Sequence, residues 1–142
     1  MTDAVFVDTS VLVYARDTSE PSKKTQATKW MEFLWLSQTG RASFQVLAEF
    51  YVTVTKKLKP GLPEEQAQKD VRNLLSWSPV SVDATVLEAG WRIQEKFGTS
   101  WWDSLIVAAA QLTHSKYLLS EDLQEGQNFD GARSQAVIGS DG

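Results

Sequence analysis

Four acidic residues, Asp8, Glu49, Asp103 and Asp122, stand at points of the sequence where carboxylates can share one site. If they converge, they repel one another: two like charges about 5 Å apart cost roughly 3 kcal/mol at an effective dielectric of 20. A divalent cation relieves that repulsion, and a set of oxygen ligands favours Mg²⁺ or Mn²⁺. Such a site binds a phosphate oxygen and lowers the pKa of a bound water, so the implied chemistry is phosphodiester hydrolysis.

Each acid also has a purely structural interpretation. Asp8 can cap the helix that follows it. Asp103 lies three residues after Ser100, in the pattern of a helix cap and its first turn. Glu49 borders an apolar helix face and can be a solvated boundary residue. Both interpretations stay open for each residue, and only convergence of the four favours a site.

Neighbouring polar residues extend the hypothesis. The hydroxyls of Thr9, Ser10 and Ser120 lie beside the acids in sequence and can orient them through hydrogen bonds. Lys56 and Lys57 belong to a small basic cluster. Their side chains either contact RNA phosphates or solvate a helix end, where positive charge is favourable.

Short apolar runs and amphipathic stretches alternate along the chain and must position these residues. Apolar runs typical of buried strands occupy 4–7 and 116–120, each followed by acidic residues, and shorter strands are expected at 41–44, 80–82 and 136–138. Helices are expected near 11–15, from 20 to a stop at Gly40, at 45–58, from 63, from Asp83 to Phe97 and from Ser100 to about Thr113. The helix after Ser100 is apolar almost all round, so we expect it to be buried. Alternation of strands and helices predicts an α/β fold with a central, mostly parallel sheet flanked by helices.

Composition narrows the possible functions. The 142 residues suit one domain, 1–142, in which 132–142 is a tail without an assigned role. The sequence has no Cys and one His, which excludes thiolate zinc sites, cysteine nucleophiles and sites with several histidines. The net charge of −4 argues against a protein that holds nucleic acid by general positive charge. With no signal peptide and no membrane span in the sequence, we expect a cytoplasmic protein.

Four segments together resemble the successive motifs of PIN-domain ribonucleases, and most closely VapC-type toxins of bacterial toxin–antitoxin pairs. The segments are FVDTSVLVYA at 6–15, QVLAEFY at 45–51, WDSLIVAAA at 102–110 and LLSEDL at 118–123. They cover nearly the whole chain, in the order and at the spacing of the family. One such segment is a weak signal, whereas all four together are highly specific.

The resemblance implies a PIN-like domain that acts as the toxin of a type II toxin–antitoxin system. Asp8, Glu49, Asp103 and Asp122 match the acidic positions around Mg²⁺ or Mn²⁺ in the family. The implied activity is endonucleolytic cleavage of RNA, commonly in tRNA or rRNA loops, by metal-activated water. A cognate antitoxin would block the groove, and the toxin would commonly form a homodimer.

Two positions bear on the match. Ser10 stands where the family often has Asn, which keeps a hydroxyl but removes an amide. Glu121 precedes Asp122, and the Ser-x-Asp pattern favours Asp122 as the inward acid.

Two other functions compete with the nuclease. A receiver-like phosphoacceptor domain also uses an acid after its first strand, but Asp83 and Lys116 fit its remaining positions poorly. A non-catalytic PIN-like binding module would keep the fold without turnover, although the presence of all four acids argues against it.

Overall fold

The computed structural model describes residues 3–121, 123 and 125–136. Its centre is a five-stranded sheet with the order β2-β1-β3-β5-β4. The strands are β1 (Val5–Val7), β2 (Gly40–Arg41), β3 (Tyr117–Leu119), β4 (Asn128–Phe129) and β5 (Ala132–Gln135). Every pairing is parallel except that of β4 with β5, so the predicted α/β class with a mostly parallel sheet is confirmed.

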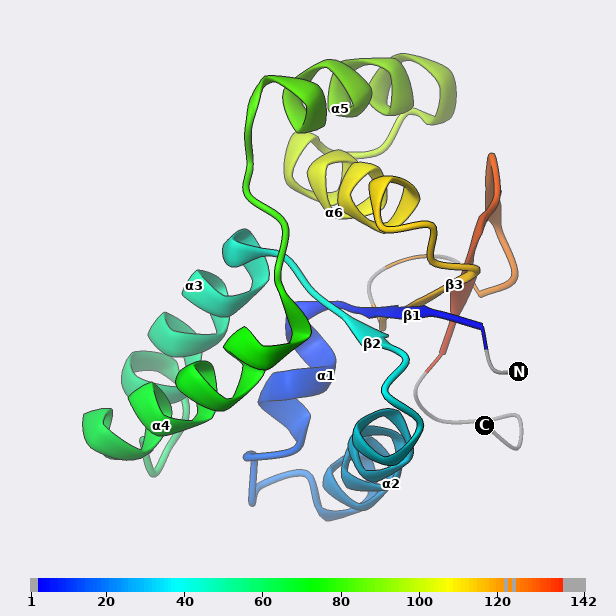
Figure 1. Cartoon of the computed structure of the whole chain (residues 1–142). Helices are drawn as coiled ribbons and strands as arrows, with labels where there is room; N and C mark the ends of the chain where they lie inside the picture. The colour runs from blue at the N-terminus through cyan, green and yellow to red at the C-terminus, as the bar shows by residue number, and fades with distance from the viewer. Residues whose placement is uncertain (1–2, 122, 124, 137–142) are drawn as a thin grey trace.

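Helices cover both faces of the sheet, with α5 and α6 on one side and α1 and α2 on the other (Figure 1). The α3 and α4 helices lie side by side beyond the β2 edge (Figure 1). The helices are α1 (Thr9–Tyr14), α2 (Pro21–Ser37), α3 (Phe44–Val52), α4 (Glu64–Leu74), α5 (Ala84–Phe97) and α6 (Trp101–Leu112). No helix in the described ranges is long and apolar enough to cross a membrane.

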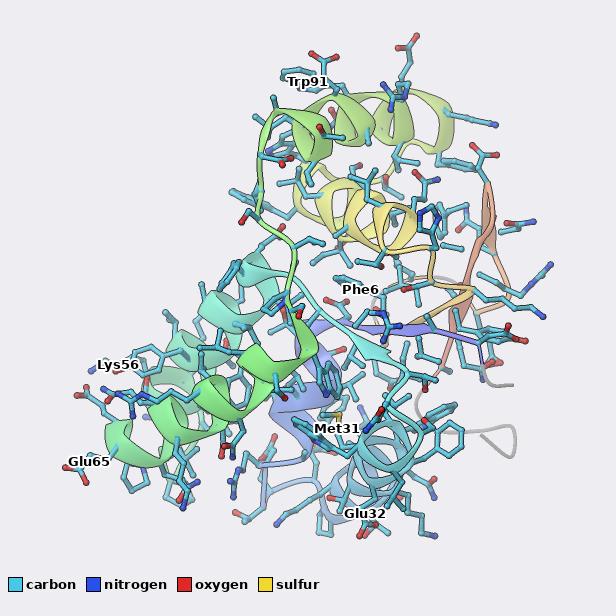
Figure 2. The ribbon with its side chains drawn as sticks, viewed as in Figure 1. Phe6, Met31, Glu32, Lys56, Glu65 and Trp91 are labelled. Carbon is cyan, nitrogen blue, oxygen red and sulfur yellow. The ribbon has the colours of Figure 1, made fainter. Side chains whose placement is uncertain are left out.

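The α6 helix lies in the interior, as its apolar sequence predicts. Seven consecutive residues, Ser104–Ala110, are buried. The small side chains Ala108, Ala109 and Ala110 let α6 approach its neighbours closely, and helix propensity is highest for alanine. On the sheet beneath it, Phe6 is fully buried and labelled in Figure 2.

Gly40 does not end the second helix, contrary to the sequence prediction. The helix ends at Ser37, and its C-cap Gln38 adopts the left-handed conformation with φ 59°. Gly40 instead begins β2, where an added Cβ would overlap the ring of Trp77. Glycine is required there by the close approach of an aromatic ring, and the two roles look alike in sequence.

Two strand predictions, 41–44 and 80–82, differ from the structure. In place of 41–44, β2 covers Gly40–Arg41, and Phe44 already begins α3. Residues 80–82 form no strand; Val80 makes a single parallel bridge with Ser43. Pro79 cannot extend the ladder because it lacks an N–H, and Asp83 already caps α5. Among the described residues the last strand is β5, whereas Val137 and Ile138 of the strand expected at 136–138 lie outside the described residues. Its polar sequence, ARSQ, hides the strand from an apolar-run criterion.

The helix predicted over 45–58 changes its hydrogen bonding part-way. After α3, residues Thr53–Lys57 form a π-helical turn, η1. The following Leu58 is extended, and its N–H donates to the carbonyl of Thr53 at 3.0 Å. Single π turns are commonly found near functional sites, but hydrophobic periodicity does not predict them.

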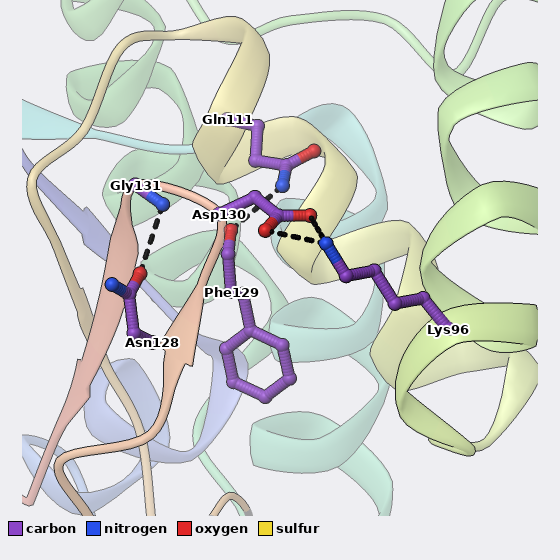
Figure 3. Close-up of polar contacts among 6 residues, drawn as sticks. All are labelled: Lys96, Gln111, Asn128, Phe129, Asp130 and Gly131. Atoms are coloured by element: carbon purple, nitrogen blue, oxygen red, sulfur yellow. Dashed lines mark hydrogen bonds and ion pairs between the residues drawn. The ribbon is translucent and has the colours of Figure 1, made fainter.

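The β4–β5 hairpin is attached to α5 and α6 by side-chain contacts (Figure 3). Lys96 donates to both carboxylate oxygens of Asp130, at 2.8 and 2.9 Å, and Gln111 donates to the carbonyl of Phe129 at 2.7 Å. The ring of Phe129 is buried and packs edge-on against the ring of Phe97, with 4.9 Å between the ring centres. These contacts hold the hairpin in place, with β5 beside β3 and β4 at the sheet edge opposite β2.

Candidate active site

Asp8 lies just past the carboxyl end of β1 and is only 4% exposed. Its backbone N–H donates to the carbonyl of Leu119 at 3.0 Å, which continues the β1–β3 ladder by one residue. One carboxylate oxygen accepts from the backbone N–H of Thr9 at 2.7 Å, and the other accepts from the hydroxyl of Ser120 at 2.7 Å. Asp8 is therefore the N-cap of α1 and at the same time a fixed, buried carboxylate at the sheet edge.

Thr9 joins Asp8 to Glu49. Its backbone N–H binds Asp8, and its hydroxyl donates to one carboxylate oxygen of Glu49 at 2.8 Å. The other oxygen of Glu49 accepts from the side-chain amide of Gln45 at 3.3 Å, one turn earlier in α3. Two acids 41 positions apart in sequence are thus held on opposite sides of one threonine.

Ser10 connects the same edge to the segment after β3. Its hydroxyl accepts from the backbone N–H of Glu121 at 3.4 Å. The Glu121 carboxylate lies 4.0 Å from the ammonium of Lys23 in α2. Thr9, Ser10 and Ser120 therefore link the ends of β1 and β3 to Glu49 in α3.

Asp103 is half-buried in the first turn of α6. Its backbone N–H donates to the hydroxyl of Ser100, the N-cap, at 3.1 Å. The predicted cap is therefore present, and it leaves the carboxylate at the positive end of a helix, where negative charge is stabilised. Asp103 shares no hydrogen-bond partner with Asp8 or Glu49 among the contacts of the described residues.

Asp122, the fourth predicted acid, lies outside the described residues. Within the described ranges, no three Asp, Glu or His side chains stand close enough together to form a metal site. The donor chemistry nevertheless suits Mg²⁺ or Mn²⁺, because Asp8 and Glu49 supply carboxylate oxygens and the neighbouring groups are hydroxyls.

The two lysines predicted to contact RNA lie on the π-helical turn after α3. Lys56 pairs with Glu64 of α4 at 3.3 Å, and both side chains are more than half exposed. Figure 2 shows Lys56 at the outer end of the α3–α4 pair. The ion pair supports the helix-end interpretation of Lys56, and RNA contact by Lys56 and Lys57 stays a prediction.

Residues that the sequence reasoning missed also belong to this region. Gln45 was placed at the start of a helix but given no role, although it lies four residues before Glu49 and so on the same helix face. Lys23 lies in the helix expected from residue 20 and was given no role. No local pattern shows its contact with Glu121, because the two residues are 98 positions apart.

An apolar groove of about 960 Å³ lies between α1, α2 and α4. Its walls include Leu12, Met31, Trp35, Leu36 and Phe50, and Leu36 is 86% exposed. Asp8, Glu49 and Asp103 do not line the groove, so it is a surface separate from the candidate active site.

A model of the PIN domain matches residues 5–124. The chain belongs to the PIN-domain family. The family predicted from the four motifs is therefore confirmed, and the match includes all four acidic positions. A search of curated proteins finds no match.

Solved structures share this PIN fold at low sequence identity. A toxin–antitoxin complex from Klebsiella pneumoniae aligns with a TM-score of 0.60 and 16% identity, over 91% of this chain and 94% of that chain. VapBC2 from Rickettsia felis, bound to a DNA fragment from its promoter, gives a TM-score of 0.62 and 18% identity, over 94% of this chain and 98% of that chain. VapC20 from Mycobacterium tuberculosis, described as a toxin that cleaves the sarcin–ricin loop, gives a TM-score of 0.60 and 16% identity, over 81% of this chain and 87% of that chain. At these identities the likeness shows a common fold.

Proposed function

We propose that this PIN-domain protein is a metal-dependent endoribonuclease and the toxin of a type II toxin–antitoxin system. The observation that carries the proposal is the Thr9 bridge. It holds a buried carboxylate, Asp8, and a half-buried one, Glu49, at the carboxyl edge of the sheet. In open α/β sheets this edge is where ligands bind.

In this proposal Asp8, Glu49, Asp103 and Asp122 would hold Mg²⁺ or Mn²⁺. The bound cation would supply charge neutralisation at a phosphate and a more acidic water. The role of the protein's own residues is to fix the carboxylates before substrate binds. Thr9 and Ser120 each donate to one acid, which restricts the rotation of both carboxylates, and a carboxylate beside the phosphate would orient the attacking water as a base.

The proposed substrate is RNA in single-stranded loops, such as those of tRNA or rRNA. Unstacked bases in loops leave the backbone accessible, whereas the deep groove of an A-form helix does not admit side chains. The similarity in fold to VapC20, described as cleaving an RNA loop, supports this substrate class.

The proposal includes a cognate antitoxin. Support comes from the fold shared with a toxin–antitoxin complex and with VapBC2, and from the apolar groove between α1, α2 and α4. Exposed apolar side chains such as Leu36 suit an apolar protein segment better than a phosphate backbone. A homodimer, common among VapC-type toxins, and a cytoplasmic location complete the proposal.

The deciding experiment incubates the purified protein with total RNA in Mg²⁺ or Mn²⁺, with and without EDTA, and maps the new RNA ends. We expect a small set of cleavage sites that EDTA abolishes. Uniform absence of cleavage with both metals would favour the alternative of a non-catalytic PIN-like binding module. The receiver-like alternative is not retained, because the chain belongs to the PIN-domain family.

A further inference from the structure

Lys23 is the cation that the fold places beside the segment following β3. Its ammonium lies 4.0 Å from the Glu121 carboxylate, donates to the Tyr14 hydroxyl at 3.1 Å and sits 4.8 Å from the centre of the Tyr14 ring. The Lys23 side chain is 34% exposed, so it can be reached from solvent. These contacts hold the ammonium in place, and the side chain still reaches solvent.

A short chain of contacts connects Lys23 to the candidate active site. Glu121 is bound through its backbone N–H to Ser10, and Ser10 follows the threonine that bridges Asp8 and Glu49. Ser10 and Tyr14 lie four residues apart in α1 and so share one helix face. Lys23 therefore stands at the rim of the acidic site, with Glu121 between it and the acids.

We propose that Lys23 binds a phosphate of the RNA strand at the rim of the acidic site, and that Glu121 is its resting counterion instead of a metal ligand. This inference rests on the proposed nuclease function. It assigns different roles to two adjacent acids: Glu121 pairs with Lys23, and Asp122 binds the metal ion. In the complex, an RNA phosphate oxygen takes the place of the Glu121 carboxylate beside the ammonium.

The ion pairs of the described residues favour Lys23 for this role. Arg16 makes a bidentate pair with Asp70 at 2.7 Å, and Lys96 binds both oxygens of Asp130. The Lys23–Glu121 separation is longer than these, so this pair is the more easily exchanged. A partly exposed ion pair at 4.0 Å contributes little to stability.

The net charge of the protein supports a phosphate-binding role for Lys23. With a net charge of −4 and several acids at the site, the protein repels RNA at long range. Local cations must therefore hold the phosphates that flank the cleaved bond. The hydrogen bond to Tyr14 raises the pKa of Lys23, which favours the charged ammonium.

The test measures cleavage of a synthetic single-stranded RNA in Mn²⁺ at increasing KCl, for the wild type and for Lys23→Gln. Loss of one phosphate contact on a single strand makes the negative slope of log(kcat/KM) against log[salt] shallower by about 0.7, which is about 5-fold weaker binding at 0.1 M salt. We expect the weaker binding to appear as a higher KM with kcat nearly unchanged, because the contact is made equally in the ground and transition states. Lys23→Arg should recover most of it.

Lys29→Gln is the matched control, since Lys29 lies in the same helix, carries the same charge and is exposed. An equal effect of Lys23→Gln and Lys29→Gln would overturn the inference and leave the nuclease proposal standing. If the wild type itself cleaves no RNA, the nuclease proposal and this inference both fail. Thermal unfolding of each variant separates a change in binding from a change in folding.

Glu121→Gln tests the other half of the inference. Removing the counterion should lower KM and leave unchanged the Mn²⁺ concentration that gives half-maximal activity. A large increase in that Mn²⁺ concentration would make Glu121 a metal ligand and overturn its assignment to Lys23.

Discussion

Asp8 combines two roles that compete in sequence reasoning, because one carboxylate oxygen caps α1 and the other meets Ser120. Cap and candidate ligand are therefore not alternatives at this position. A carboxylate that is 4% exposed keeps its geometry only while both oxygens have partners. Two donors, one from the backbone and one from a side chain, supply them.

This geometry makes Asp8→Asn an informative change. Asparagine caps helices about as well as aspartate, and its amide can face the Ser120 hydroxyl, so the fold should persist. The neutral amide binds dications poorly, so RNA cleavage should fall to background. Circular dichroism and a cleavage assay on the same preparation check both halves. Cleavage close to the wild-type rate would remove Asp8 from the site.

Thr9→Val separates the two contacts of the bridging threonine. Valine keeps the backbone N–H that binds Asp8 but loses the hydroxyl that binds Glu49. We expect a 10- to 100-fold loss of activity or metal affinity, the range usual for residues that orient metal ligands. Thr25→Val is the control, since the Thr25 hydroxyl bonds only within α2, and it should leave cleavage unchanged.

At the residue scale, sequence reasoning identified the groups but not their connections. Asp8, Thr9 and Ser120 were named because they follow apolar runs, and the parallel pairing of β1 with β3 brings them together. The Gln45–Glu49 bond was within reach of helix spacing. The Lys23–Glu121 contact was not, because it depends on how α2 packs against the sheet edge.

The elements of the molecule are positioned by close packing at a few points, and the clearest is Gly40 in β2. An added Cβ there would overlap the Trp77 ring, which itself packs on Trp35 at 5.1 Å between ring centres. Trp77 follows α4 in the 3₁₀ turn Leu75–Trp77, so this contact joins the α4 segment to the sheet.

Gly40→Ala should therefore destabilise the protein by about 1–3 kcal/mol, the usual cost of an overpacked site. Urea denaturation measures the change in the free energy of unfolding. The same substitution made in a Trp77→Leu background should cost clearly less, because the ring no longer blocks the Cβ. Equal costs in both backgrounds would show that backbone conformation, not packing, requires glycine.

Element prediction succeeded where apolar periodicity is strong. The buried α6, the strands β1 and β3 and the Asp83-capped α5 all follow from it. It failed where tertiary contacts decide. The isolated bridge at Val80, the π turn after α3 and the polar strand β5 depend on neighbours that a local window does not contain.

At the scale of the whole molecule, bound metal should act as a stabiliser, because a ligand that binds only the folded state raises its stability. Mn²⁺ at about 100 times its dissociation constant would add about 2.7 kcal/mol. We expect a clear rise in Tm for the wild type and a smaller rise for Asp103→Asn. Equal rises in both proteins would mean that Asp103 only occupies the first turn of α6.

The bond between Ser120 and Asp8 spans 112 positions of the chain, and β1 has β3 as a neighbour in the sheet. During synthesis, the first strand and its carboxylate leave the ribosome long before the strand that completes their surroundings. A nascent chain that has not yet released residue 120 lacks this bond and the β1–β3 pairing. The surroundings of Asp8 are therefore complete only after β3 and residue 120 have left the ribosome, whatever part of the chain has folded before.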